Sequence, residues 1–167
     1  EHIIKDKMPY DAWERLGYLT LTNTPIVDQN FVMQYVLDEC EKYNLDIQCL
    51  CFDPANASKI MMDLSDQGYT VEEVYQSHKS LNESTQGFRE QVFAGNVVYT
   101  HNPLLNYAMS NAVIRTSNGL IKIDKDANTK RIDPVDATLA AFKLALYHDF
   151  EGENLNDYVA RFLEENT

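Results

Sequence analysis

The feature that most constrains the fold is a short, almost continuous apolar run, Ile47–Phe52, which ends directly in Asp53-Pro54. A run of this length, with a single polar interruption, is typical of a strand that is buried on both faces. Strands of that kind lie in sheets that carry helices on both sides. The run therefore favours an α/β fold.

Strand-like and helix-like segments alternate along the chain, which predicts one α/β domain over residues 1–150, with a mixed sheet flanked by helices. The helix after Asp28 is expected to bury an apolar face that contains Phe31, Val32 and Tyr35, and Asn118-Gly119 is the strongest hairpin-type turn. The expected strands are residues 18–22, 47–52, 70–75, 97–99 and 120–123, and the expected helices are residues 9–16, 28–40, 55–66, 81–94, 103–114, 133–146 and 154–165.

The formal charge of −12 argues against a protein that coats nucleic acid through its overall field, but it does not exclude an enzyme that touches DNA locally. Residues 149–167 contribute −5 of this charge, and residues 151–167 are expected to form an acidic helical tail. No apolar stretch approaches the roughly 18 residues of a membrane span, and the first residues carry no apolar signal core. A cytoplasmic protein without a membrane partner is therefore expected, with Cys40, Cys49 and Cys51 as reduced, buried thiols.

Asp53 is the first candidate functional residue, because it follows the C-terminal end of the buried strand. Ligands and catalytic groups of open α/β sheets gather outside these strand ends. A purely structural interpretation, in which Asp53 caps the next helix, fits equally well. The sequence leaves both interpretations open.

Asp133 and Asp136 form the second candidate, because they stand three residues apart at a predicted helix start and share one face. The structural alternative is a capped helix, with Asp133 as the N-cap, Pro134 at the first helical position and Asp136 at the third. However, carboxylates that converge from separate elements are what Mg²⁺ requires. Two such ions can activate water and stabilise the leaving oxygen in phosphodiester cleavage.

A basic segment precedes this predicted helix and contains Lys122, Lys125, Lys130 and Arg131. An ordinary solvated turn is one interpretation. The functional interpretation is an edge that contacts phosphate beside the carboxylates.

An ordered series of short motifs resembles the nuclease half of the phage terminase large subunit family, over about residues 6 to 147. Each motif is weak alone, whereas the series in this order is specific. The motifs are Met8-Pro9-Tyr10-Asp11-Ala12-Trp13, Gly17-Tyr18-Leu19-Thr20-Leu21-Thr22, Ile26-Val27-Asp28, Phe52-Asp53-Pro54, Gln76-Ser77, Ser80-Leu81, His101-Asn102-Pro103, Asn111, Lys125 and Arg131-Ile132-Asp133-Pro134-Val135-Asp136-Ala137.

The resemblance implies an RNase H-like fold with an acidic two-metal site, which holds Mg²⁺ or Mn²⁺ and cuts concatemeric double-stranded DNA during packaging. Asp53 matches the family's catalytic Asp at the end of the central strand, and Asp133 matches the one at the start of a late helix. Asp136 is expected as an additional ligand or as a group that supports the ligands. Lys125, which matches a basic family position, is expected to contact the DNA backbone together with Lys130 and Arg131.

The resemblance also implies segments and partners outside this sequence. The family's first strand, with its catalytic Asp, is expected upstream of residue 1, as are the second strand of its opening hairpin and the ATPase half. An exposed sheet edge invites strand pairing, so a homodimer through the uncovered edge is a further hypothesis. The terminase small subunit and the portal are the expected partners of the parent protein, in the cytoplasm of an infected or prophage-bearing bacterium.

Two other functions compete with the endonuclease. A non-catalytic, nuclease-like module that docks on packaging partners would suit the acidic charge and the acidic tail. An unrelated α/β nucleotide-binding domain ranks last, because the sequence has no phosphate-cradling glycine loop. The endonuclease hypothesis predicts that Asp53 and Asp133, with Asp136 as an additional candidate, lie within metal-bridging reach of one another.

Overall fold

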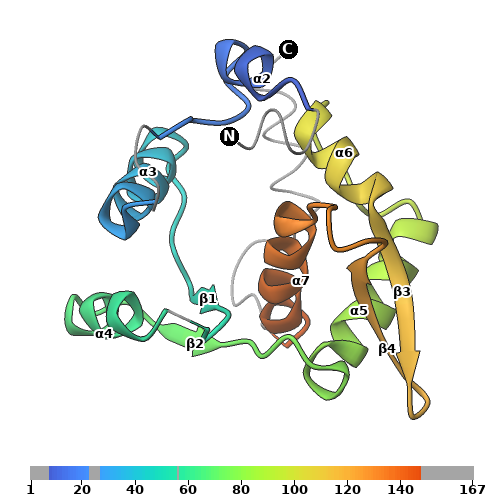
Figure 1. Ribbon diagram of the computed structural model, residues 1–167. Helices are drawn as coiled ribbons and strands as arrows, with labels where there is room; N and C mark the ends of the chain where they lie inside the picture. The colour runs from blue at the N-terminus through green and yellow to red at the C-terminus, as the bar shows by residue number, and fades with distance from the viewer. Residues whose placement is uncertain (1–7, 23–26, 56, 148–167) are drawn as a thin grey trace.

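The computed structural model describes residues 8–22, 27–55 and 57–147, and it is an α/β structure with two small sheets (Figure 1). Among these residues, no helix is long and apolar enough to cross a membrane. The elements in chain order are α2 (Tyr10–Arg15), α3 (Gln29–Lys42), β1 (Leu50–Phe52), α4 (Ser58–Asp66), β2 (Val71–Glu73), α5 (His78–Phe93), α6 (Pro103–Ser110), β3 (Ala112–Ser117), β4 (Leu120–Lys125) and α7 (Asp133–Ala145).

The strand predicted from the apolar run is the first strand of a parallel β1–α4–β2 unit. Leu50 lies opposite Val71 and Phe52 opposite Glu73. Ile60 and Leu64 of α4 are buried against side chains of both strands, because they recur at helical spacing on one face. The unit therefore carries Asp53, the residue after β1, on a short strand that α4 covers.

The Asn118-Gly119 turn joins β3 and β4 into an antiparallel hairpin, as the sequence predicts for the turn. Both turn residues have positive φ angles, 50° and 78°, which a two-residue hairpin of type I′ requires. The prediction that residues 112–114 continue a helix is wrong. Helix α6 ends at Ser110, and the β-branched residues that follow, Val113 and Ile114, pair with β4 instead.

Helix α7 lies between the two sheets (Figure 1). Val135 and Leu139 are fully buried, and they pack with Phe88 of α5 and Ala108 of α6. A neighbouring position of the same helix, Ala140, packs instead with Val74, which follows β2, and with Cys51 of β1. One helix thus supplies core residues to both halves of the described structure, the half with the β3–β4 hairpin and the half with the β1–β2 sheet.

Two predicted strands do not form. Residues 18–22 have no ladder partner among the described residues, and the N–H of Leu21 donates to Oε1 of Glu14 at 2.8 Å instead. Residues 97–99 are also irregular, with the side chain of Val98 91% exposed. A predicted strand forms only where a second strand is available to satisfy its N–H and C=O groups.

The strand pairs and helix α3 also differ from expectation. β1–β2 and β3–β4 are two separate two-stranded sheets in the described structure, not one continuous mixed sheet. Asp28 caps α3 as predicted, since its side chain accepts from the N–H of Asn30 at 2.9 Å. The expected buried face is wrong, however, because Phe31, Val32 and Tyr35 are exposed. The predicted helix at residues 154–165, and with it the acidic tail at residues 151–167, lies outside the described residues.

Replacing Leu139 tests the central role of α7. Leu139→Ala should reduce the free energy of unfolding by about 2–5 kcal/mol, because it leaves a cavity in the core that α7 shares with α5 and α6. Leu16→Ala is the matched control, since Leu16 is 68% exposed, and it should change stability by less than about 0.5 kcal/mol. Urea denaturation followed by circular dichroism measures both values, and equal losses would contradict the assignment.

Candidate functional site

The predicted acidic residues come from two neighbouring elements, helix α7 and the end of strand β1. Asp133 is the first residue of this helix and Asp136 lies one turn further on, while Asp53 follows β1. Cys51 of β1 packs against the buried cluster around Ala140 of α7, so β1 and α7 are neighbours. A fourth acid, Asp124, comes from β4.

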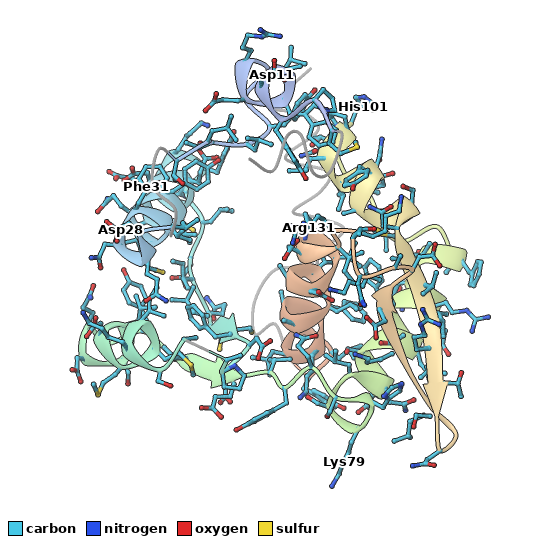
Figure 2. The ribbon with its side chains drawn as sticks, viewed as in Figure 1. Asp11, Asp28, Phe31, Lys79, His101 and Arg131 are labelled. Carbon is cyan, nitrogen blue, oxygen red and sulfur yellow. The ribbon has the colours of Figure 1, made fainter. Side chains whose placement is uncertain are left out.

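A pocket of about 220 Å³ lies at this place, and its lining mixes acidic and basic side chains. The acids are Asp124, Asp133 and Asp136, and the bases are Lys122, Lys125, Lys130 and Arg131. Arg131 is labelled beside the start of α7 in Figure 2. The structure thus brings the three predicted DNA-contacting residues to the pocket that holds two of the predicted metal ligands.

Asp136 shows that the acids act on one another. The pKa of its carboxyl is raised from 3.8 to about 6, first because the group is half-buried and second because Asp133 is close by. The charges of Asp124 and Asp53 raise this pKa further, whereas Lys122 lowers it. Asp53 does not line the pocket, but its negative charge reaches Asp136.

The purely structural interpretations of these acids do not hold. The N-cap of α7 is Ile132, and no side chain caps this helix, so neither Asp133 nor Asp136 forms the expected capping arrangement. Asp53 does not cap α4, which begins at Ser58 after Ala57. One carboxylate oxygen of Asp53 accepts from the N–H of Ala55 at 3.2 Å, which forms a local turn.

The donor chemistry fits a hard divalent cation, since all four groups supply carboxylate oxygens. Burial is the first cause of the raised pKa of Asp136, and the second is the negative charge of Asp133, which a cation would offset. Within residues 8–22, 27–55 and 57–147, however, no three Asp, Glu, His or Cys side chains are arranged to hold one metal ion. The expected close cluster of Asp53, Asp133 and Asp136 is therefore not formed by the described side chains, and their assignment as metal ligands stays a prediction.

Asn111 fixes the loop that leads into α7. Its side chain is buried and donates from Nδ2 to the backbone oxygen of Arg131 at 3.1 Å. The backbone oxygen of Asn111 accepts from the N–H of Asp126 at 2.9 Å. These two bonds span the segment that carries Lys130 and Arg131. Asn111 therefore positions the basic wall of the pocket, which consists of Lys125, Lys130 and Arg131. His101, another residue of the motif series, is exposed before α6 (Figure 2).

In the sequence, Lys122 is one member of the basic segment and Asp124 is not singled out, but the structure places both in the pocket. They form an ion pair of 3.2 Å, and the side chain of Lys122 is only 18% exposed. Burial works to raise the pKa of Asp124, but the N–H of Lys125 and the ammonium of Lys122 outweigh it and hold that pKa below its usual value. Their spacing on a strand, two residues apart, was the available signal, since such residues share one face.

Comparison with known proteins agrees with the α/β fold. The family of terminase large subunit endonuclease domains matches residues 1–149. The terminase large subunit of Enterobacteria phage HK97 is 26% identical over 160 residues, which is 93% of this chain and 31% of that protein. The crystal structure of the HK97 bacteriophage large terminase matches with a TM-score of 0.74 at 26% identity, over 85% of this chain and 30% of the other.

The fold is thus that of a terminase nuclease domain, for which an RNase H-like arrangement is expected. The chain belongs to the terminase large subunit endonuclease-domain family. It spans about a third of the length of the HK97 relative.

The raised pKa of Asp136 predicts a pH-dependent stability of the metal-free protein. Between about pH 4 and 6 the folded state binds more protons at this carboxyl than the unfolded state, so stability falls as the pH rises through this range. Asp136→Asn removes the titrating carboxyl and, with it, this loss of stability. The variant should melt above the wild type at about pH 7.5 and lose this advantage at about pH 4, where the native carboxyl is also neutral.

Thermal melts in EDTA across this range measure the effect. Asp66→Asn, at the exposed end of α4, is the control and should shift the melting temperature little at either pH. A difference between Asp136→Asn and wild type that stays constant with pH would refute the assigned cause.

Proposed function

We propose that this chain is the DNA-cutting module of a phage DNA-packaging terminase. The observation that carries the proposal is a pocket in which Asp124, Asp133 and Asp136 lie beside basic side chains, with the charge of Asp53 reaching Asp136, in a chain of the terminase endonuclease family. Its substrate is concatemeric double-stranded phage DNA, which it cuts by metal-dependent phosphodiester hydrolysis.

Asp53, Asp133 and Asp136 are the residues that would hold Mg²⁺ or Mn²⁺. When bound, a pair of such ions supplies an activated water and stabilises the leaving oxygen. The ligands come from two elements, β1 and α7, so packing between these elements sets the spacing of the carboxylates. Asp136 is half-buried on α7, and the negative charges of Asp133, Asp124 and Asp53 add to the effect of burial in raising the pKa of its carboxyl.

Lys125, Lys130 and Arg131 would bind the DNA backbone at the same pocket. Their cationic groups recognise phosphate, which is the same at every base pair, so little sequence specificity is expected from them. Asn111 holds the backbone of this wall in place. The net charge of the chain is −12, so contact with DNA depends on these local cations and not on the overall field.

Cleavage of supercoiled plasmid in Mn²⁺ tests the proposal. Asp53→Asn keeps an oxygen that can accept from the N–H of Ala55 but removes the negative charge. It should reduce nicking at least about 10–100-fold, as expected when a metal site loses a charged group. EDTA should abolish nicking, and Asp63→Asn, on the exposed face of α4, should leave it unchanged.

The competing function is a non-catalytic module that docks on packaging partners such as the portal or the small subunit. The exposed apolar residues of α3, Phe31, Val32 and Tyr35, are the observation that favours it, because exposed apolar patches mark interaction sites. Metal-dependent cleavage of DNA separates the two functions, because only the endonuclease requires it. No cleavage by this chain, and none by a chain extended upstream with the residues of its parent, would support docking alone.

The edge of β1 that faces away from β2 has no strand partner among the described residues, which keeps the homodimer proposal open to test. Light scattering coupled to size-exclusion chromatography should give twice the mass of the 167-residue chain. A single monomeric species for the wild-type chain at high concentration would refute the dimer.

A further inference from the structure

Lys122 lies inside the acidic pocket, and it is held differently from the pocket's other lysines. Its ammonium Nζ is 3.2 Å from Oδ2 of Asp124, and it donates to the backbone oxygen of Gln76 at 3.4 Å. Lys125 and Lys130 line the same pocket from exposed positions, and neither forms an ion pair with a described acid. Lys122 is thus the cation that the fold itself places among the carboxylates.

The backbone around Lys122 is fixed from two sides. On one side β4 pairs with β3, where Lys122 lies opposite Arg115. On the other side the N–H of the preceding residue, Ile121, donates to Oδ1 of Asn82 in α5 at 2.8 Å. Because strand and helix both hold this position, the ammonium stays at the pocket even though its side chain is long.

The charge of Lys122 acts on Asp136, which the proposed function assigns to metal, and on Asp124, which lines the same pocket. It opposes the effect of Asp133 and burial on Asp136, and it pairs directly with Asp124. The ammonium is 3.2 Å from Oδ2 of Asp124, so its positive charge repels a divalent cation that approaches the carboxylate oxygens of the pocket. It also neutralises part of the negative charge that would attract such a cation.

We propose that Lys122 is a positioning residue that keeps the metal-free carboxylates together and lowers the affinity of the site for divalent cations. This inference rests on the proposed metal site, and it concerns how tightly that site is filled. The consequence is a site that binds metal weakly by itself and is filled more readily when a DNA phosphate adds negative charge and takes over the ammonium.

Mn²⁺ binding to the whole chain, measured by isothermal titration calorimetry with and without a short DNA duplex, tests this inference. Lys122→Met should bind Mn²⁺ roughly tenfold more tightly than wild type without DNA, the size expected for one charge acting on a divalent ion through a few ångströms of water-like medium. Lys122→Arg keeps the charge and should bind Mn²⁺ as the wild type does. DNA should tighten Mn²⁺ binding to the wild type more than to Lys122→Met.

Lys79→Met is the matched control, because Lys79 is exposed on α5 and points away from the structure (Figure 2). It should leave the affinity for Mn²⁺ unchanged. Thermal melting of each variant checks that the fold is kept, and Lys122→Arg separates loss of charge from loss of packing if Lys122→Met is destabilised.

The outcomes separate this inference from the proposed function. Equal or weaker Mn²⁺ binding by Lys122→Met, with clear binding by wild type, would overturn the role of Lys122 and leave the nuclease proposal standing. Absence of Mn²⁺ binding in every form, with or without DNA, would overturn both the role of Lys122 and the metal site. Tighter binding by Lys122→Met, with no DNA cleavage by this chain or by a chain extended upstream, would support the inference and contradict the nuclease.

Discussion

Burial of one face of α7 is the interaction on which the rest of the described structure depends. Val135 and Leu139 anchor the helix to α5 and α6, and Ala140 anchors it to β1 through Cys51. The two small sheets share no ladder, so the helix between them keeps their relative position. Because Asp133 and Asp136 lie in its first turn, the same packing that stabilises the fold also determines where these two carboxylates lie.

Local sequence signals predicted most elements that are defined by their own residues. The Asn118-Gly119 turn, the cap at Asp28 and the apolar run before Asp53 each act within a few residues, and the structure confirms each of them. Asp53, Asp133 and Asp136 were placed near one another by family resemblance and strand-end reasoning. The structure brings them within electrostatic reach, while their role in binding metal stays a prediction.

The failures of prediction share a physical cause, because each depended on a partner distant in sequence. Residues 18–22 have strand composition but no ladder partner among the described residues, and residues 112–114, which the sequence predicts as the end of a helix, pair with β4. Phe31 and Tyr35 recur at helical spacing, which says that a face is apolar but not what covers it. The sequence shows Lys122 only as one member of a basic segment, since only the folded hairpin brings its ammonium to Asp124 and Gln76.

The separation of the two sheets has a mechanical consequence. Asp53 moves with the β1–α4–β2 unit, whereas Lys122 and Asp124 move with the hairpin, and α7 carries Asp133 and Asp136 between them. A slide of either sheet along the helix changes the spacing between acids without disturbing any hydrogen-bonded ladder. The spacing between Asp53 and the acids of α7 therefore depends on how the β1–α4–β2 unit packs on this helix.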